Sequence, residues 1–171
     1  RMAMKLKTIL VVDDDRDTCW LLSQMLGSYG FCIKTVFDGK SAIAELANAS
    51  PELVLLYLNL PEIGGMGVLE EIRKRDKDVI VIILSGYGDT KRVVNAMKLG
   101  AFDYITKPFN NKELVALIKN AMESRRKADT EGTRKNNALS SPESVKGNSP
   151  QIRHVLEVIE VVAPTNMTVV L

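Results

Sequence analysis

The chain has few of the residues from which metal centres, disulfide frameworks and nucleic-acid surfaces are built. Its 171 residues include one histidine, His154, and two cysteines, Cys19 and Cys32, whose spacing matches neither a CxxC pair nor a zinc motif. The formal net charge of +2 is too small to indicate nucleic acid or an anionic membrane as a partner. We therefore expect reduced packing cysteines, a solvated histidine and no direct binding of nucleic acid by this chain.

Long hydrophobic runs are also missing. The apolar stretch 9–12 meets the aspartates at 13–15 at once, so it is too short for a signal peptide or a membrane span. With 46% hydrophobic and 26% charged residues, the composition is that of an ordinary soluble protein able to bury one sizeable core. A cytoplasmic location without membrane association is the expectation.

What the sequence does contain is a regular alternation of strand and helix signals joined by short connections. Buried-strand patterns predict strands at 8–12, 31–36, 53–58, 79–84 and 103–106. Apolar residues at helical spacing follow each of them, and the fifth helix begins at Asn110, whose side chain can cap it together with Glu113. Successive βα units of this kind predict an α/β fold, with helices on both faces of a parallel sheet.

The pattern stops after residue 125. The segment 126–148 is polar and contains Gly, Ser and Pro, so it cannot bury enough apolar surface to offset its chain entropy and is predicted to be a linker. Ser149 and Pro150 then make a typical helix start, and 168–171 has the pattern of a first strand. The predicted organisation is a first domain at 5–125, the linker, and the truncated start of a second domain at 149–171.

Polar side chains follow the predicted strands at the edge where a parallel sheet places its ligands. They are Asp13 and Asp14 after the first strand, Tyr57 at the end of the third, Ser85 after the fourth and Lys107 after the fifth. Adjacent carboxylates suit a hard divalent cation such as Mg²⁺, and a lysine near a hydroxyl suits a phosphoryl group. At any one position alone a helix cap is the simpler interpretation, but the combination favours a magnesium and phosphoryl site.

Four ordered blocks resemble a known family. Residues 9–15, 53–61, 83–88 and 101–109 read ILVVDDD, LVLLYLNLP, ILSGYG and AFDYITKPF. In sequence and order they resemble the receiver domain of bacterial two-component response regulators, over about residues 5 to 125. Residues 147–152 and 159–171 look like the start of the AAA+ domain of sigma-54-dependent transcription activators, in which a phosphate-binding P-loop would follow Leu171.

The resemblance implies a flavodoxin-like, doubly wound sheet with strand order 2-1-3-4-5. It further implies that Asp13, Asp14 and the backbone carbonyl of Asn59 hold Mg²⁺, while Ser85 and Lys107 contact a phosphoryl group. The implied partners are a sensor histidine kinase, a second copy of the chain and, through the missing domains, sigma-54 RNA polymerase.

Two further features follow from the resemblance alone. Tyr104 corresponds to the aromatic residue whose rotamer reports the state of the site to the surface of the fourth helix, fifth strand and fifth helix. Lys107 and Pro108 correspond to a pair joined by a cis peptide, which proline makes tolerable.

Two positions depart from the family pattern. Tyr57 occupies the place of the phosphorylated aspartate, and Gly64 stands where an aspartate is common in the following loop. Acyl phosphate formation needs a carboxylate that is ionised at neutral pH, whereas a phenol is largely protonated there. Ordinary aspartyl phosphorylation is therefore excluded at this position, and the Mg²⁺ site is weakened. The change fits either a naturally phosphorylation-independent receiver or a variant chain.

Two functions from different classes remain open. One is a non-enzymatic signalling module that biases the assembly of an attached sigma-54-activator ATPase. The other is a structural or dimerising domain of an activator whose ATPase is constitutive. A flavodoxin-like cofactor binder is a third, but aspartates 13–15 would repel a phosphate unless a metal intervened. The glycines at 64, 65 and 67 do not complete a dinucleotide loop, since position 70 is Glu, and predict a loop-to-helix turn instead.

Overall fold

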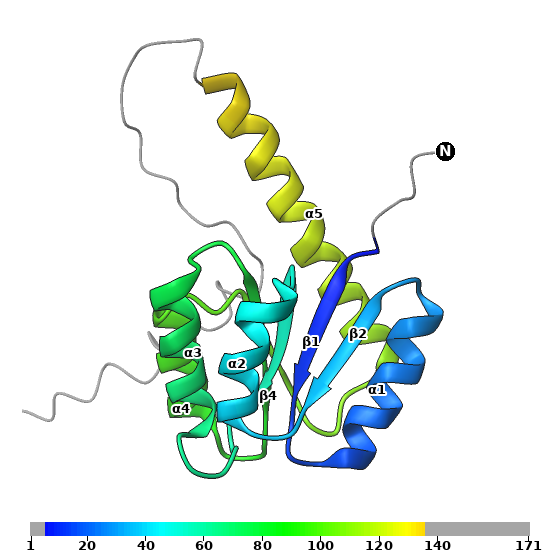
Figure 1. Cartoon of the computed structure of the whole chain (residues 1–171), viewed down its shortest axis with the longest axis vertical. Helices are drawn as coiled ribbons and strands as arrows, with labels where there is room; N and C mark the ends of the chain where they lie inside the picture. Colours follow the sequence, from blue (N-terminus) through cyan, green and yellow to red (C-terminus); the bar gives the residue numbers. More distant parts are fainter. Residues whose placement is uncertain (1–5, 136–171) are drawn as a thin grey trace, which may run out of the picture. The chain divides into compact units, whose positions relative to one another are not determined.

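Strands and helices alternate strictly through residues 6–135, which are the residues that the computed structural model describes (Figure 1). The strands are β1 (Thr8–Val12), β2 (Cys32–Val36), β3 (Leu53–Tyr57), β4 (Ile80–Ser85) and β5 (Asp103–Thr106). The helices are α1 (Arg16–Ser28), α2 (Gly39–Ala49), α3 (Gly64–Arg75), α4 (Thr90–Lys98) and α5 (Asn111–Lys135). Each predicted strand is present, and no strand end differs from its prediction by more than one residue.

The strands form one parallel sheet with the order β2-β1-β3-β4-β5, as the resemblance implied. In register, Val12 of β1 lies beside Leu56 of β3, and Tyr57 lies beside Leu84 of β4. Because all strands run the same way, their carboxyl ends meet at one edge of the sheet. The residues that follow β1, β3, β4 and β5 are therefore neighbours in space.

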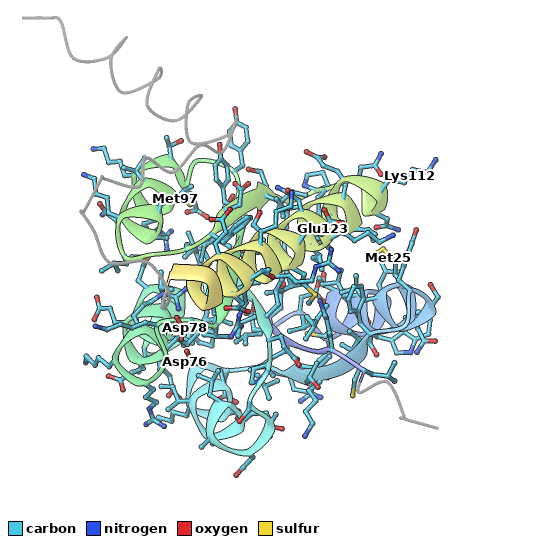
Figure 2. All side chains as sticks on the ribbon, turned by 90° about the horizontal axis from the view of Figure 1, so that it is seen from above. Met25, Asp76, Asp78, Met97, Lys112 and Glu123 are labelled. Atoms are coloured by element: carbon cyan, nitrogen blue, oxygen red, sulfur yellow. The ribbon has the colours of Figure 1, made fainter. Side chains whose placement is uncertain are left out.

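Both faces of the sheet are buried, which explains the nearly continuous apolar runs in β1, β3 and β4. Alternate strand residues supply two cores: Ile9 and Leu55 pack beneath α1 and α5, whereas Leu10 and Val54 pack beneath α2, α3 and α4. In Figure 2, Met25 of α1 and Met97 of α4 lie on opposite sides of the sheet, each against its own core. The two cores hold the carboxyl edge in place from both sides.

Asparagine and aspartate side chains cap three of the helices. Asp15 caps α1 by accepting hydrogen bonds from the backbone N–H of Asp17 at 3.1 Å and from the Thr18 hydroxyl at 2.6 Å. Asp38 caps α2, and Asn110 Oδ1 accepts from the N–H of Lys112 at 2.8 Å at the start of α5, as predicted. The third aspartate of the 13–15 run is thus a helix cap, and only the first two remain for a site.

Helix α5 continues to Lys135, well past residue 125. The first part of the segment expected to be a linker, 126–135, is therefore helical. The end of the buried stripe marks where α5 leaves the sheet and does not mark where the helix ends, because residues such as Arg, Lys, Ala and Glu sustain an exposed helix. The interpretations of Ser149, Pro150 and 168–171 lie outside the described residues.

Candidate functional site

Asp13 is the buried centre of the carboxyl edge. Its side chain is 0% exposed, and both of its carboxylate oxygens are engaged: Oδ1 accepts from the backbone N–H of Asp15 at 3.0 Å, and Oδ2 forms an ion pair with Lys107 Nζ. Burial raises the pKa of the Asp13 carboxyl above its ordinary value, and the hydrogen bonds from Lys107 and Asp15 offset part of that rise. The carboxylate is held by the cationic side chain of the residue that follows β5, the outermost strand on that side of the sheet.

Lys107 bridges this carboxylate and the predicted phosphoacceptor position. Its ammonium nitrogen lies 3.8 Å from the centroid of the Tyr57 ring, within the range of a cation–π contact. Its backbone N–H donates to the carbonyl of Ser85 at 2.8 Å, and the Lys107–Pro108 bond is cis, as the resemblance implied. The lysine thus joins the ends of β1, β3, β4 and β5.

Tyr57 is half-buried at the end of β3 and packs against both cores. Its hydroxyl makes a long contact of 3.5 Å with Asn59 Nδ2, which donates to Asp89 Oδ2 at 2.9 Å. Asp89 also accepts from the N–H of Gly86 at 2.7 Å and pairs with Arg92 at 2.8 Å. This chain of contacts connects the end of β3 to the β4–α4 loop.

Asp89 and Arg92 were not singled out from the sequence. The signal that could have found Asp89 is its place immediately before the α4 pattern, where aspartate is a common cap. In the structure Asp89 is 7% exposed, and its side chain turns toward Asn59 and Gly86. It belongs to the wall of the site.

The other predicted site residues are distributed less closely. Ser85 is 2% exposed, and its hydroxyl donates to the carbonyl of Ile105 at 3.4 Å and lies 3.1 Å from the Thr106 hydroxyl. Tyr104 is half-buried against the core beneath α3 and α4, and Asp14 is exposed. The structure therefore brings together Asp13, Lys107, Tyr57 and Asn59, with Ser85 bonded toward β5.

A Mg²⁺ ion fits these side chains poorly. Within residues 6–135, no three His, Cys, Asp or Glu side chains are arranged to hold a metal ion. Asp13 has both oxygens in use, Asp14 lies in solvent, and Tyr57 offers a ring where a third carboxylate is expected. Magnesium needs oxygen ligands in near-octahedral geometry, which this arrangement does not supply.

The glycines after β3 have a structural role. Gly64 has φ of +66°, and a Cβ on Gly65 would lie 2.3 Å from the Tyr57 carbonyl oxygen and 2.6 Å from Leu58 Cα. Only glycine lets α3 begin against the end of β3 at this distance. The predicted loop-to-helix turn is confirmed.

Cys19 is a packing residue. Its thiol is buried and donates to the Asp13 carbonyl at 3.3 Å, and burial raises its pKa to about 11. Cys32 is exposed and reduced on β2. Of the helices within 6–135, none has the length and apolar composition needed to cross a lipid bilayer.

A five-stranded sheet of this order, with an acidic residue and a lysine meeting at its carboxyl edge, defines a receiver fold. Residues 9–119 match the response regulator receiver domain, and the chain belongs to that family. It is 32% identical over 165 residues to the nitrogen assimilation regulatory protein NtrX of Azorhizobium caulinodans, covering 95% of this chain and 36% of that protein. It is 31% identical over 163 residues to the transcriptional regulatory protein ZraR of Escherichia coli, again covering 95% and 36%.

Among solved structures, the receiver domain of NtrX from Brucella abortus is similar, with a TM-score of 0.65 and 36% identity over 67% of this chain and 98% of that one. The chain is thus close to the NtrX and ZraR regulators. It spans 36% of the length of these two curated relatives.

Proposed function

We propose that this chain is the receiver module of a two-component regulator of sigma-54-dependent transcription, in which Tyr57 stands at the phosphoacceptor position and prevents aspartyl phosphorylation. The observation that carries the proposal is the end of β3, where a phenol ring packs under the Lys107 ammonium. The buried carboxylate of Asp13 already pairs with that ammonium, so it is a poor substitute nucleophile.

The relatives supply the wider setting. NtrX and ZraR carry names of nitrogen-assimilation and transcriptional regulators, and both are much longer than this chain. In the proposed protein, residues 5–125 form the receiver, 126–148 connect it, and 149–171 begin an AAA+ domain that contacts sigma-54 RNA polymerase. The receiver itself is not an enzyme, and it works in the cytoplasm with a sensor histidine kinase and a second copy of the chain as partners.

A structural role is the second candidate. The contacts from Tyr57 through Asn59 to Asp89 order the β4–α4 loop without any phosphoryl group. This favours a receiver held in one state, which serves as a phosphorylation-independent dimerisation domain of a constitutive ATPase activator.

Phosphorylation with a small phosphodonor and Mg²⁺ tests the first proposal. Mass spectrometry should find no acyl phosphate in the parent chain or in Tyr57→Phe, whereas Tyr57→Asp should become labelled at position 57. Label on the parent at Asp13 or Asp14 would show that the residue at position 57 does not decide the chemistry.

Sedimentation at several protein concentrations separates the two candidates. If Tyr57 fixes one switch state of a signalling module, the parent and Tyr57→Asp differ in dimer fraction before any donor is added. Equal dimerisation of both, unchanged when the aspartate variant is phosphorylated, would favour the purely structural role.

A further inference from the structure

The ammonium of Lys107 lies between the Asp13 carboxylate and the Tyr57 ring, at the edge of the sheet where the sequence predicts a Mg²⁺ site. We propose that Lys107 is the built-in cation of this pocket, held between the Asp13 carboxylate and the Tyr57 ring, so that the site is closed to Mg²⁺ and not merely weakened for it. The inference rests on the proposed function only in taking Tyr57 to stand at the phosphoacceptor position.

On the carboxylate side of this arrangement, each oxygen already has a partner. Asp13 is fully buried, and its two oxygens are divided between the Asp15 N–H and the Lys107 ammonium. A buried carboxylate needs such partners, because an unpaired charge away from water is costly. A metal ion at Asp13 would have to share Oδ2 with the lysine ammonium, which repels it, or displace the lysine.

The ring side makes that displacement harder. The Tyr57 ring presents its electron-rich face to the ammonium at 3.8 Å from the centroid, a contact that exists only while Lys107 stays in the pocket. A carboxylate at position 57 would act in the opposite way: it would leave two negative charges to share one ammonium, and the excess charge would attract a divalent cation. The tyrosine therefore changes the charge balance from one that invites a metal to one that is nearly neutral.

The position of Lys107 is fixed from behind as well. Its backbone N–H is bonded to the Ser85 carbonyl at 2.8 Å, and its side chain is only 23% exposed. Asp14, the remaining carboxylate of the predicted metal set, is exposed. One solvated carboxylate is a weak ligand for a cation that holds its own water tightly.

Direct Mg²⁺ titration tests the inference. Calorimetry on the parent chain should show no saturable binding, whereas Lys107→Gln, which removes the ammonium and keeps a side chain of similar length, should bind Mg²⁺ at least about tenfold more tightly than the parent. Lys112→Gln serves as the matched control, because Lys112 is an exposed lysine at the start of α5 and its loss should leave the parent's behaviour unchanged. Saturable Mg²⁺ binding by the parent would overturn the inference.

A second measurement uses the unsubstituted protein and does not depend on the variant folding. The NMR signal of the Lys107 ammonium should be visible because exchange with water is slowed in the pocket, and Mg²⁺ should not shift it. A saturable shift of that signal would mean that the metal displaces the lysine, which contradicts the inference.

The result is separable from that of the phosphorylation experiment. A parent chain that binds Mg²⁺ but accepts no phosphoryl group overturns the built-in cation and leaves the proposed function standing. A parent that binds no Mg²⁺ but becomes phosphorylated on Asp14 in a metal-free reaction overturns the proposed function and leaves the built-in cation standing.

Discussion

Two buried aspartates lie at opposite ends of the parallel strands, and their carboxylates have different partners. Asp13 follows β1 at the carboxyl edge and is paired with Lys107. Asp103 begins β5 at the other edge, is 1% exposed, and has only a bond from the Tyr104 N–H at 2.8 Å to Oδ1. Its Oδ2 has no hydrogen-bond partner among residues 6–135.

Burial acts on both carboxyls in the same direction. It raises the pKa of Asp13 and the pKa of Asp103, and in each case backbone or side-chain hydrogen bonds offset part of the rise. The difference lies in the cation: Asp13 has one, from a residue 94 positions away in the sequence, whereas Asp103 forms no ion pair with any residue of 6–135. An ion pair between residues so distant in the sequence supports the carboxyl edge as the functional site. The unpaired oxygen of Asp103, by contrast, only destabilises the fold locally.

Breaking the pair at the carboxyl edge should have the largest effect. Lys107→Gln leaves Asp13 buried without its cation, and we expect a loss of about 3 kcal/mol in the free energy of unfolding. Urea unfolding at neutral pH measures it. Lys34→Gln is the control, since Lys34 pairs with Glu45 in an exposed position and its loss should change stability little. Equal losses in the two variants would mean that the Asp13 pair is energetically an ordinary surface pair.

Placing a second carboxylate beside Asp13 should have the next largest effect. Two unit charges about 5 Å apart at an effective dielectric near 20 repel by on the order of 3 kcal/mol before screening, so Tyr57→Asp should be less stable than the parent without metal. Mg²⁺ should then raise the melting temperature of Tyr57→Asp and leave that of the parent nearly unchanged, because stabilisation grows with ligand concentration over the dissociation constant. Thermal melts across a Mg²⁺ series check both expectations.

The control for this series is Tyr57→Phe, which keeps the ring under Lys107 and adds no charge. It should melt close to the parent and ignore Mg²⁺. A melting-temperature shift as large in the parent as in Tyr57→Asp would mean that Asp13, Asp14 and backbone oxygens suffice to hold the metal.

Much of the fold and the position of the site could be predicted from the sequence for one physical reason. Buried parallel strands are continuous apolar runs, and their carboxyl ends converge whatever the loops do. That convergence predicts Asp13, Tyr57 and Lys107 at one edge of the sheet. It could not say which partner Lys107 would choose, because a flexible side chain settles among groups that are distant in the sequence.

The errors have physical causes as well. Burial periodicity cannot detect a helix that has left the core, so the sequence pattern does not predict the extension of α5 to Lys135. The role of Asp89 was missed because a residue before a helix has a local explanation as a cap, whereas here its carboxylate bonds to Asn59, 30 positions away. The predicted roles of Ser85 and Tyr104 remain predictions.

The far edge of the sheet offers a smaller effect of opposite sign. Asp103→Asn removes a charge that has no cation, and we expect the variant to be more stable than the parent by about 1 kcal/mol at neutral pH. Because the folded-state pKa of Asp103 is raised from 3.8, the folded protein holds the proton more tightly than the unfolded chain does. Proton binding at Asp103 therefore stabilises the folded state of the parent when the pH is below 3.8. This stabilisation is lost as the pH rises through the folded-state pKa.

Urea unfolding of the two proteins from acidic to neutral pH checks the sign. The difference in stability should be smallest below pH 3.8 and should grow in favour of Asp103→Asn above it. Asp78 is an exposed residue in the loop after α3 (Figure 2) and serves as the control. Asp78→Asn should leave the dependence of stability on pH unchanged. A parent that gains stability over Asp103→Asn with rising pH would indicate a partner for Oδ2 that stabilises the charge.

The smallest expected effect concerns the contact between Tyr57 and the β4–α4 loop. Asn59→Ala removes the amide that joins the Tyr57 hydroxyl to Asp89, but the Tyr57 contact is long at 3.5 Å and Asp89 keeps its bonds to Gly86 and Arg92. We therefore expect a loss of about 1 kcal/mol or less in the free energy of unfolding. Amide hydrogen exchange should locate the change, with faster exchange at the Gly86 N–H and unchanged exchange in β1 and β2. If exchange at Gly86 is the same in both proteins, the Asn59 amide does not order the loop, and the connection between the two ends of the site must pass through Lys107 alone.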